Sequence, residues 1–288
     1  MRIKKVLPCY FILAFLSGIA LSVWRTVLMV RYYDPYNNEY AVEAFGQLEA
    51  IGLTLFFVLV LLATAAFVLR SFTFKPHDTA EHSGSVFTSA LLGFVFLAVS
   101  IFISFDLNVI LENIQFPLFR YAQIVSYALL FPCAVYFVVN AMGNPGLETV
   151  KKALSFVPPL WGVAFLLASH IDPAYNYKDF NHTLCNVAIG ALTVFFLYET
   201  KAAVTGKASI AYFVFSLISL TASMVCMIPT FVLLAYWELS SNLNHLFEAV
   251  LLGSIFYTCA CFFRLCKNVT PCEKKPKEKK EKAEDPNA

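Results

Sequence analysis

AIGLTLFFVLVLLATAAFVLR, residues 50–70, holds no charged side chain before its final arginine. A helix needs about 20 mainly apolar residues to cross the hydrocarbon core of a bilayer. Because lipid offers the backbone no hydrogen-bond partner, an uninterrupted apolar run of this length must be helical. Residues 50–70 therefore predict a transmembrane helix, and the fold depends on how often the chain repeats this pattern.

The same apolar pattern recurs along most of the chain. We predict eight spans, at about 7–29, 50–70, 86–105, 121–141, 153–169, 183–199, 209–235 and 245–265. Of the 288 residues, 59% are hydrophobic and 14% are charged, whereas soluble domains carry about 25% charged residues. A transmembrane barrel would show alternating strands of about ten residues, and no segment shows them. The sequence predicts an all-α, polytopic transmembrane helix bundle in the cell membrane.

Lysine and arginine are distributed unevenly between the two sets of connections. All of them except Arg25, Arg31, Arg120 and Lys178 fall on one predicted side. Cytoplasmic loops retain basic residues, so we expect both termini to be cytoplasmic. The first residues also resemble a signal peptide, but their apolar run continues to Val30, which favours an uncleaved first helix.

The chain divides into a helical domain, 1–270, and a tail, 271–288, that is rich in lysine and acidic residues. Such a composition cannot bury enough apolar surface to fold, so we expect a disordered cytoplasmic tail. A weak internal similarity relates KKVL, Trp24 and DPYN to KKAL, Trp161 and DPAYN. If it reflects a duplication, the two four-span halves lie near 1–144 and 145–270, as in the parallel repeats of some transporters.

Several short motifs stand out along the chain. They are Arg25 with Asp34-Pro35, then Pro159-Leu160-Trp161, then Phe195-Phe196-Leu197-Tyr198-Glu199. In these residues the chain resembles a group of multi-pass membrane proteins of Gram-positive anaerobes. That group has no assigned activity, so the resemblance implies a location and an architecture but no mechanism.

The polar connection SHIDPAYNYKDFNHTLCN, residues 169–186, is the candidate for a metal site. His170, Asp172 and His182 lie in it, and His245 begins the eighth span on the same outer side. Two or three histidines with a carboxylate suit zinc, but the tight His-x-x-x-His spacing of zinc hydrolases is absent. Aromatic residues with polar tips are also common where helix ends meet water. We therefore expect an interfacial connector without a cofactor, and a metal site or contact with another ligand are the alternatives.

Small and mildly polar residues form a stripe along the seventh predicted span. They are Ser216, Ser219, Ser223, Cys226 and Thr230, spaced three or four residues apart. This spacing places them on one face of a helix. Small residues let transmembrane helices approach closely, and hydroxyl groups bond across the interface. We expect a packing seam between helices, and the polar lining of a solute path is the alternative.

Charge and loop length limit the function classes. No Asp, Glu, Lys or Arg lies near the middle of a span, although ion-coupled carriers usually need such residues. The loops leave no room for a soluble catalytic domain, and no catalytic motif is present. We expect a non-enzymatic protein that senses or scaffolds through helix contacts, with the bilayer and a membrane or cytoplasmic protein as partners and no nucleic acid.

The alternative function is transport of a small neutral solute. Pro132, Pro158-Pro159 and Pro229 lie within spans, and each removes a helical hydrogen bond and kinks or restarts its helix. Kinked helices and the polar stripe are both compatible with a transporter or facilitator. A membrane enzyme that uses the outer histidines is the third class, and it would require those side chains to converge.

Overall fold

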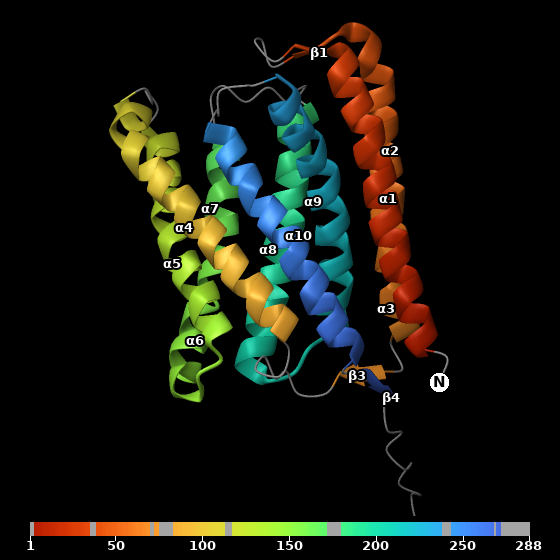
Figure 1. Ribbon diagram of the computed structural model, residues 1–288, viewed down its shortest axis with the longest axis vertical. Helices are drawn as coiled ribbons and strands as arrows, with labels where there is room; N and C mark the ends of the chain where they lie inside the picture. Colours follow the sequence, from red (N-terminus) through yellow and green to blue (C-terminus); the bar gives the residue numbers. More distant parts are fainter. Residues whose placement is uncertain are drawn as a thin grey trace, which may run out of the picture.

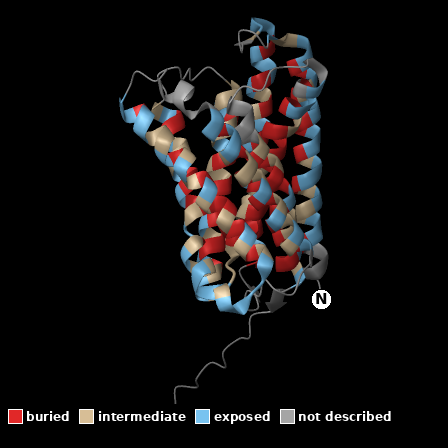
Figure 2. Cartoon of the chain, turned by 60° about the vertical axis from the view of Figure 1, so that its left-hand side comes forward, coloured by how far each residue is buried: buried red, intermediate tan, exposed pale blue. Residues whose placement is uncertain are grey.

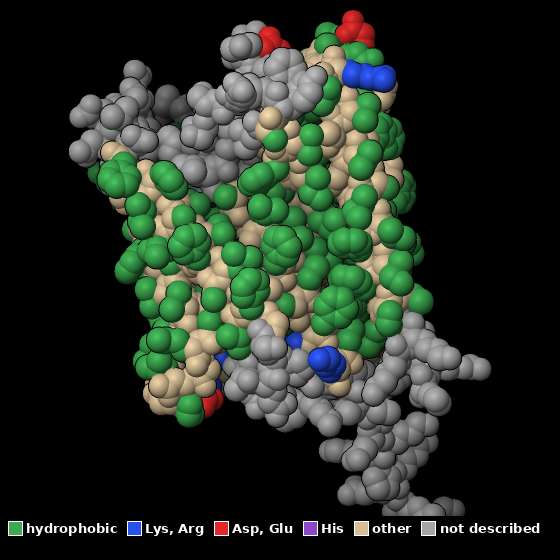
Figure 3. Space-filling model, viewed as in Figure 1, with side chains coloured by type: hydrophobic (Ala, Val, Ile, Leu, Met, Phe, Trp, Pro, Cys, Tyr) green, Lys and Arg blue, Asp and Glu red, His purple; other side chains and the backbone are tan. Residues whose placement is uncertain are grey.

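The computed structural model describes residues 3–34, 39–69, 72–74, 83–112, 117–171, 180–237, 243–267 and 269–271. Within these residues, eight helical segments are long and apolar enough to cross a membrane, which confirms the predicted helix bundle and its number of spans. On the face shown in Figure 3, hydrophobic side chains form a broad band, and charged side chains lie above and below it. The protein is a multi-pass membrane protein.

The spans are built from ten helices in the described part of the chain. They are α1 (Ile3–Tyr32), α2 (Phe45–Ala63) with α3 (Ala65–Leu69), α4 (Ser83–Glu112), α5 (Pro117–Met142), α6 (Glu148–Leu154) with α7 (Val157–Ile171), α8 (Phe180–Thr205), α9 (Ile210–Trp237) and α10 (Leu243–Lys267). Short 3-10 helices, Val42–Ala44 and Pro145–Leu147, precede α2 and α6. Two antiparallel strand pairs join β1 (Tyr33–Asp34) to β2 (Glu39–Tyr40) and β3 (Phe72–Phe74) to β4 (Val269–Pro271).

Proline and glycine explain where helices stop and restart. The fifth span is interrupted after α6, and α7 begins one residue before Pro158. Proline lacks an N–H donor and is tolerated in the first turn of a helix, so the predicted restart is confirmed. Gly143 and Gly206 follow α5 and α8 with φ of 61° and 68°, a backbone conformation that glycine adopts at little cost and that commonly ends helices.

Six of the spans form a closed ring. Each of α4, α5, α7, α8, α9 and α10 packs against the next, and α10 returns to α4. Outside this ring, α1 and α2 both pack against α9 (Figure 1). As a result, 78% of the most apolar stretch of α9 is buried within the protein, against 22% for the second span. Figure 2 shows buried residues inside the bundle and exposed residues on its outer surface. The helix α9 is therefore the central element of the fold.

The interior of the ring is largely aromatic. The ring of Phe137 in α5 lies 5.6 Å from Phe96 in α4, 5.6 Å from Phe196 in α8 and 5.2 Å from Tyr257 in α10, measured between centroids. Trp161 of α7 packs edge-on against Phe96 at 5.0 Å. Such pairs contribute roughly 0.5–1.5 kcal/mol each beyond their buried area. These aromatic contacts surround the polar groups of the candidate site.

The packing does not separate the two predicted halves. Helices α1 and α2 of the first half contact α9, and α4 and α5 contact α10 and α7. The duplication stays a prediction, as does the disordered tail, because residues 272–288 lie outside the described part of the chain. The start of α1 and the end of α10 lie at the same end of the bundle (Figure 1). We call this the cytoplasmic end, following the distribution of lysine and arginine.

Candidate functional site

The first buried polar cluster centres on Glu199, near the cytoplasmic end of α8. This side chain is only 3% exposed. Its Oε1 accepts hydrogen bonds from the hydroxyl of Tyr136 in α5, at 3.3 Å, and from the hydroxyl of Tyr257 in α10. Its Oε2 is buried and has no hydrogen-bond partner among the described residues. The carboxylate therefore joins three helices and leaves one acceptor unused.

Asn140 extends the Glu199 cluster towards α4. Its Nδ2 donates to the Tyr257 hydroxyl at 3.3 Å and to Ser89 Oγ at 3.1 Å. Ser89 Oγ in turn donates to the backbone carbonyl of Phe137 at 2.9 Å. Four ring helices are thus connected through buried hydrogen bonds. Such networks favour the one arrangement that satisfies them, because polar atoms left unpaired in a low-dielectric interior are costly.

Arg264 of α10 brings a second charge close to this cluster. It is 2% exposed, and its Nη2 donates to the Tyr212 hydroxyl of α9 at 3.2 Å and contacts Cys261 Sγ at 3.7 Å. The only ion pair found among the described residues is the surface pair of Lys152 with Glu148, so Arg264 and Glu199 are each held by tyrosine hydroxyls. A charge buried in a membrane protein is costly and commonly marks a functional site.

The second buried cluster lies in the outer half of the bundle, around Arg25 of α1. Arg25 is 1% exposed, and its Nη1 donates to the carbonyls of Val225 at 2.7 Å and Cys226 at 2.6 Å. Its Nη2 donates to Asn181 Oδ1 at 2.8 Å. Pro229 has no N–H, so the Val225 carbonyl four residues earlier has no helical donor. Arg25 supplies the missing donor from another helix.

Close contact between α1 and α9 brings Arg25 into this position. Ser22 Oγ donates to the Met224 carbonyl at 2.9 Å, and Thr221 Oγ1 donates to the Ala14 carbonyl at 3.2 Å. A Cβ placed on Gly18 would lie 3.0 Å from Met224 Sδ. Small residues on α1 thus let the two backbones approach closely, as expected for helices that associate in lipid.

The predicted stripe on α9 starts near the first cluster and passes through the second, since Cys226 belongs to both the stripe and the Arg25 cluster. All five of its residues are buried, and none is more than 4% exposed. Ser216 and Thr230 donate to carbonyls of their own helix, whereas the hydroxyls of Ser219 and Ser223 have no hydrogen-bond partner among the described residues. Tyr212 lies four residues before Ser216 and extends the same helical face. Whether the stripe is a packing seam or a solute path stays a prediction.

The connection at residues 169–186 is only partly described. His170 is exposed at the end of α7. His182 Nε2 lies 2.7 Å from Ser169 Oγ, and Ser169 Oγ donates to Asn186 Oδ1 at 2.7 Å. Asp172 lies outside the described residues, as does the side chain of His245 in α10. No group of three metal-ligating residues occurs within the described ranges. The choice between a connector and a metal site stays a prediction.

Three charged residues away from the middles of their spans are buried. Arg25, Glu199 and Arg264 are each no more than 3% exposed. The reason is helix orientation, because each faces another helix instead of the solvent. For Arg25 a signal existed in the sequence. It follows Ala14, Gly18 and Ser22 at steps of four, four and three residues, which extends a face of small residues.

The chain matches no protein-family model, no curated protein and no solved structure. The fold and its buried clusters define the class of the molecule, which is a polytopic α-helical membrane protein. Any finer statement about function depends on the geometry of the two clusters.

Proposed function

We propose that the protein is a non-enzymatic membrane sensor or scaffold that works through its helix contacts, and that Glu199 is the residue at which its state is set. The supporting observation is the bonding of one carboxylate. Oε1 holds α5 and α10 against α8, while Oε2 is buried without a partner among the described residues. A change in the charge or occupancy of this group alters three helix contacts together.

The resemblance to multi-pass membrane proteins of Gram-positive anaerobes agrees with this proposal but adds no activity to it. A sensor also needs an output, and the described helices leave little beyond the membrane to provide one. A membrane or cytoplasmic protein that contacts the bundle is therefore part of the proposal. If the helices around Glu199 have two arrangements, the protein responds only to an input that binds or stabilises one arrangement better than the other.

Hydrogen exchange on the full chain in lipid nanodiscs tests the role of Glu199. The variants Glu199→Gln and Tyr257→Phe should each increase exchange at the cytoplasmic ends of α5, α8 and α10 and leave the outer ends of these helices unchanged. Glu148→Gln is the matched control, because the Glu148 side chain is 63% exposed and pairs with Lys152 at the surface, away from the Glu199 cluster. Exchange identical to that of the unmodified protein, or equally increased along every helix, would contradict the proposal.

A second candidate function is the facilitated passage of a small neutral solute. The observation that favours it is the pair of buried hydroxyls at Ser219 and Ser223, which lack partners among the described residues and lie on the central helix. Stopped-flow measurements on proteoliposomes with glycerol and with urea test this candidate. Faster entry than into protein-free liposomes, abolished by Ser223→Leu, would support it, and equal rates would exclude these solutes.

A further inference from the structure

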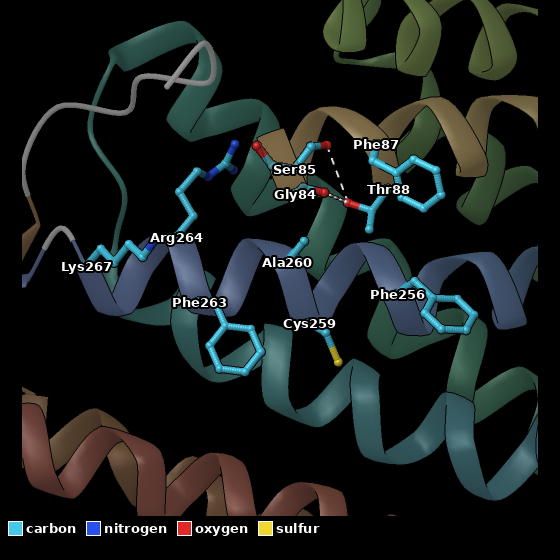
Figure 4. A pocket seen from close by; sticks show the side chains of 10 residues that line it. All are labelled: Gly84, Ser85, Phe87, Thr88, Phe256, Cys259, Ala260, Phe263, Arg264 and Lys267. Carbon is cyan, nitrogen blue, oxygen red and sulfur yellow. Dashed lines mark hydrogen bonds between the residues drawn. The ribbon is translucent and has the colours of Figure 1, made fainter. Parts of the chain in front are cut away.

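A groove opens between α4 and α10 at the cytoplasmic end of the bundle. Its volume is about 500 Å³, within the range of roughly 300–1,000 Å³ typical of small-molecule sites. Figure 4 shows Gly84, Ser85 and Thr88 on the α4 side and Ala260, Phe263 and Lys267 among the residues of α10. The groove therefore joins the first turn of one long helix to the last turn of another.

The cytoplasmic part of the groove is suited to an anion. Lys267 is exposed there, and Arg264 also lines the groove with its buried Nε lacking a partner among the described residues. The first amides of α4 have no partners within their helix, and a helix N-terminus attracts negative charge. A Cβ added to Gly84 would meet nothing within 4 Å, so an anion can approach this backbone.

The remaining wall of the groove is apolar and faces the lipid. Phe87 is 68% exposed, Phe256 is 50% exposed and Phe263 is 52% exposed, and all three line the groove. A free phosphate ion gains nothing from such a wall. A phospholipid does, because its acyl chain lies along the aromatic side chains while its phosphate reaches the basic residues.

We propose that this groove binds one anionic phospholipid of the cytoplasmic leaflet. Its phosphate lies near Lys267 and the start of α4, and its acyl chain follows Phe256 and Phe263. Basic pockets between transmembrane helices on the cytoplasmic side bind anionic headgroups in this way. The site lies beside the Glu199 cluster and shares Arg264 with it, but the proposal does not depend on the function proposed for Glu199.

Native mass spectrometry of the full chain tests the lipid site, with phosphatidylglycerol and phosphatidylcholine of the same acyl chains as probes. The unmodified protein should retain phosphatidylglycerol several-fold more than phosphatidylcholine. Lys267→Gln should remove most of this preference. Lys207→Gln is the matched control, because Lys207 is an exposed lysine at the same end of the bundle but outside the groove, and it should leave the preference intact.

A second variant tests the apolar part of the groove. Ala260→Phe places a bulky side chain in the groove and should reduce retention of both lipids, with the folded fraction unchanged. Equal retention of the two lipids by the unmodified protein would overturn the proposal, as would equal losses in Lys267→Gln and Lys207→Gln. Release of phosphatidylglycerol by excess inorganic phosphate alone would identify phosphate as the occupant and also refute a lipid site.

Discussion

Replacing Arg25 with methionine removes two buried hydrogen bonds and one partly buried one while keeping most of the side-chain volume. Two of them go to the carbonyls of Val225 and Cys226, and one goes to Asn181. Hydrogen bonds between helices in a membrane contribute about 0.6 kcal/mol on average and up to about 1.7. Three such bonds therefore stabilise the fold by roughly 2–5 kcal/mol. Methionine also avoids the cost of burying a guanidinium group, so we expect a net loss near the lower end of this range.

The two carbonyls should not contribute equally. The Cys226 carbonyl still accepts a hydrogen bond from the Thr230 hydroxyl at 3.2 Å. The Val225 carbonyl, by contrast, loses its donor, and Pro229 has no N–H to replace it. In a Pro229→Ala background the restored N–H can bond to Val225, and one hydrogen bond is worth roughly 0.5–1.5 kcal/mol. Arg25→Met should therefore cost about 1 kcal/mol less in that background than in the unmodified protein.

Unfolding by SDS titration in mixed micelles measures these free energies for all four members of the cycle. Arg31→Met is the control, because Arg31 lies on the same helix and is exposed; it should change stability by less than about 0.5 kcal/mol. The reasoning is refuted if Arg25→Met is as stable as the unmodified protein. The reasoning is also refuted if Arg25→Met lowers the free energy of unfolding by the same amount in the unmodified protein and in the Pro229→Ala background.

Four further predictions concern other parts of the molecule. Gly162→Ala should lower the free energy of unfolding by about 1–3 kcal/mol, measured in the same titration, because its Cβ would overlap Thr193 of α8. Ser219→Leu should lower thermal stability in detergent if the stripe is a seam, whereas reduced solute flux at unchanged stability would show a path. A reporter fused after Lys152 should read as cytoplasmic, and an external signal would overturn the assigned orientation. Element analysis should find no stoichiometric zinc, and zinc lost on His182→Ala would establish the metal site instead.

The spans could be predicted because long apolar runs have one stable form in lipid. Residues 50–70 hold no charge before Arg70 and become α2 and α3 as expected. The start of this span was placed too late, since α2 begins at Phe45 and includes Gln47 and Glu49. A span predicted from apolar residues alone leaves out polar residues such as these. A helix that extends to the membrane surface tolerates them there. Helix boundaries therefore depend on interfacial contacts as well as on apolar length.

The candidate site could not be predicted in the same way. Glu199 receives its hydrogen bonds from Tyr136 and Tyr257, which are 63 and 58 positions away in the sequence. Their meeting depends on how three helices are rotated about their axes, and a single sequence does not specify this rotation. The stripe on α9 could be found because its spacing repeats within one helix. Clusters that assemble from several helices carry no comparable local pattern.

The two buried arginines bond to the same helix at two well-separated positions. Arg25 of α1 bonds to α9 at Val225 and Cys226, and Arg264 of α10 bonds to α9 at Tyr212. At 1.5 Å per residue, Tyr212 and Cys226 lie about 21 Å apart along the helix axis. The helix pair α1 and α2 lies outside the ring and packs mainly on α9. Through Arg264 and Tyr212, a change at the Glu199 cluster could rotate α9. Such a rotation would strain the Arg25 bonds further along the helix, since these bonds fix the same helix. This connection gives the proposed sensor a physical route from the Glu199 cluster to the helix pair α1 and α2.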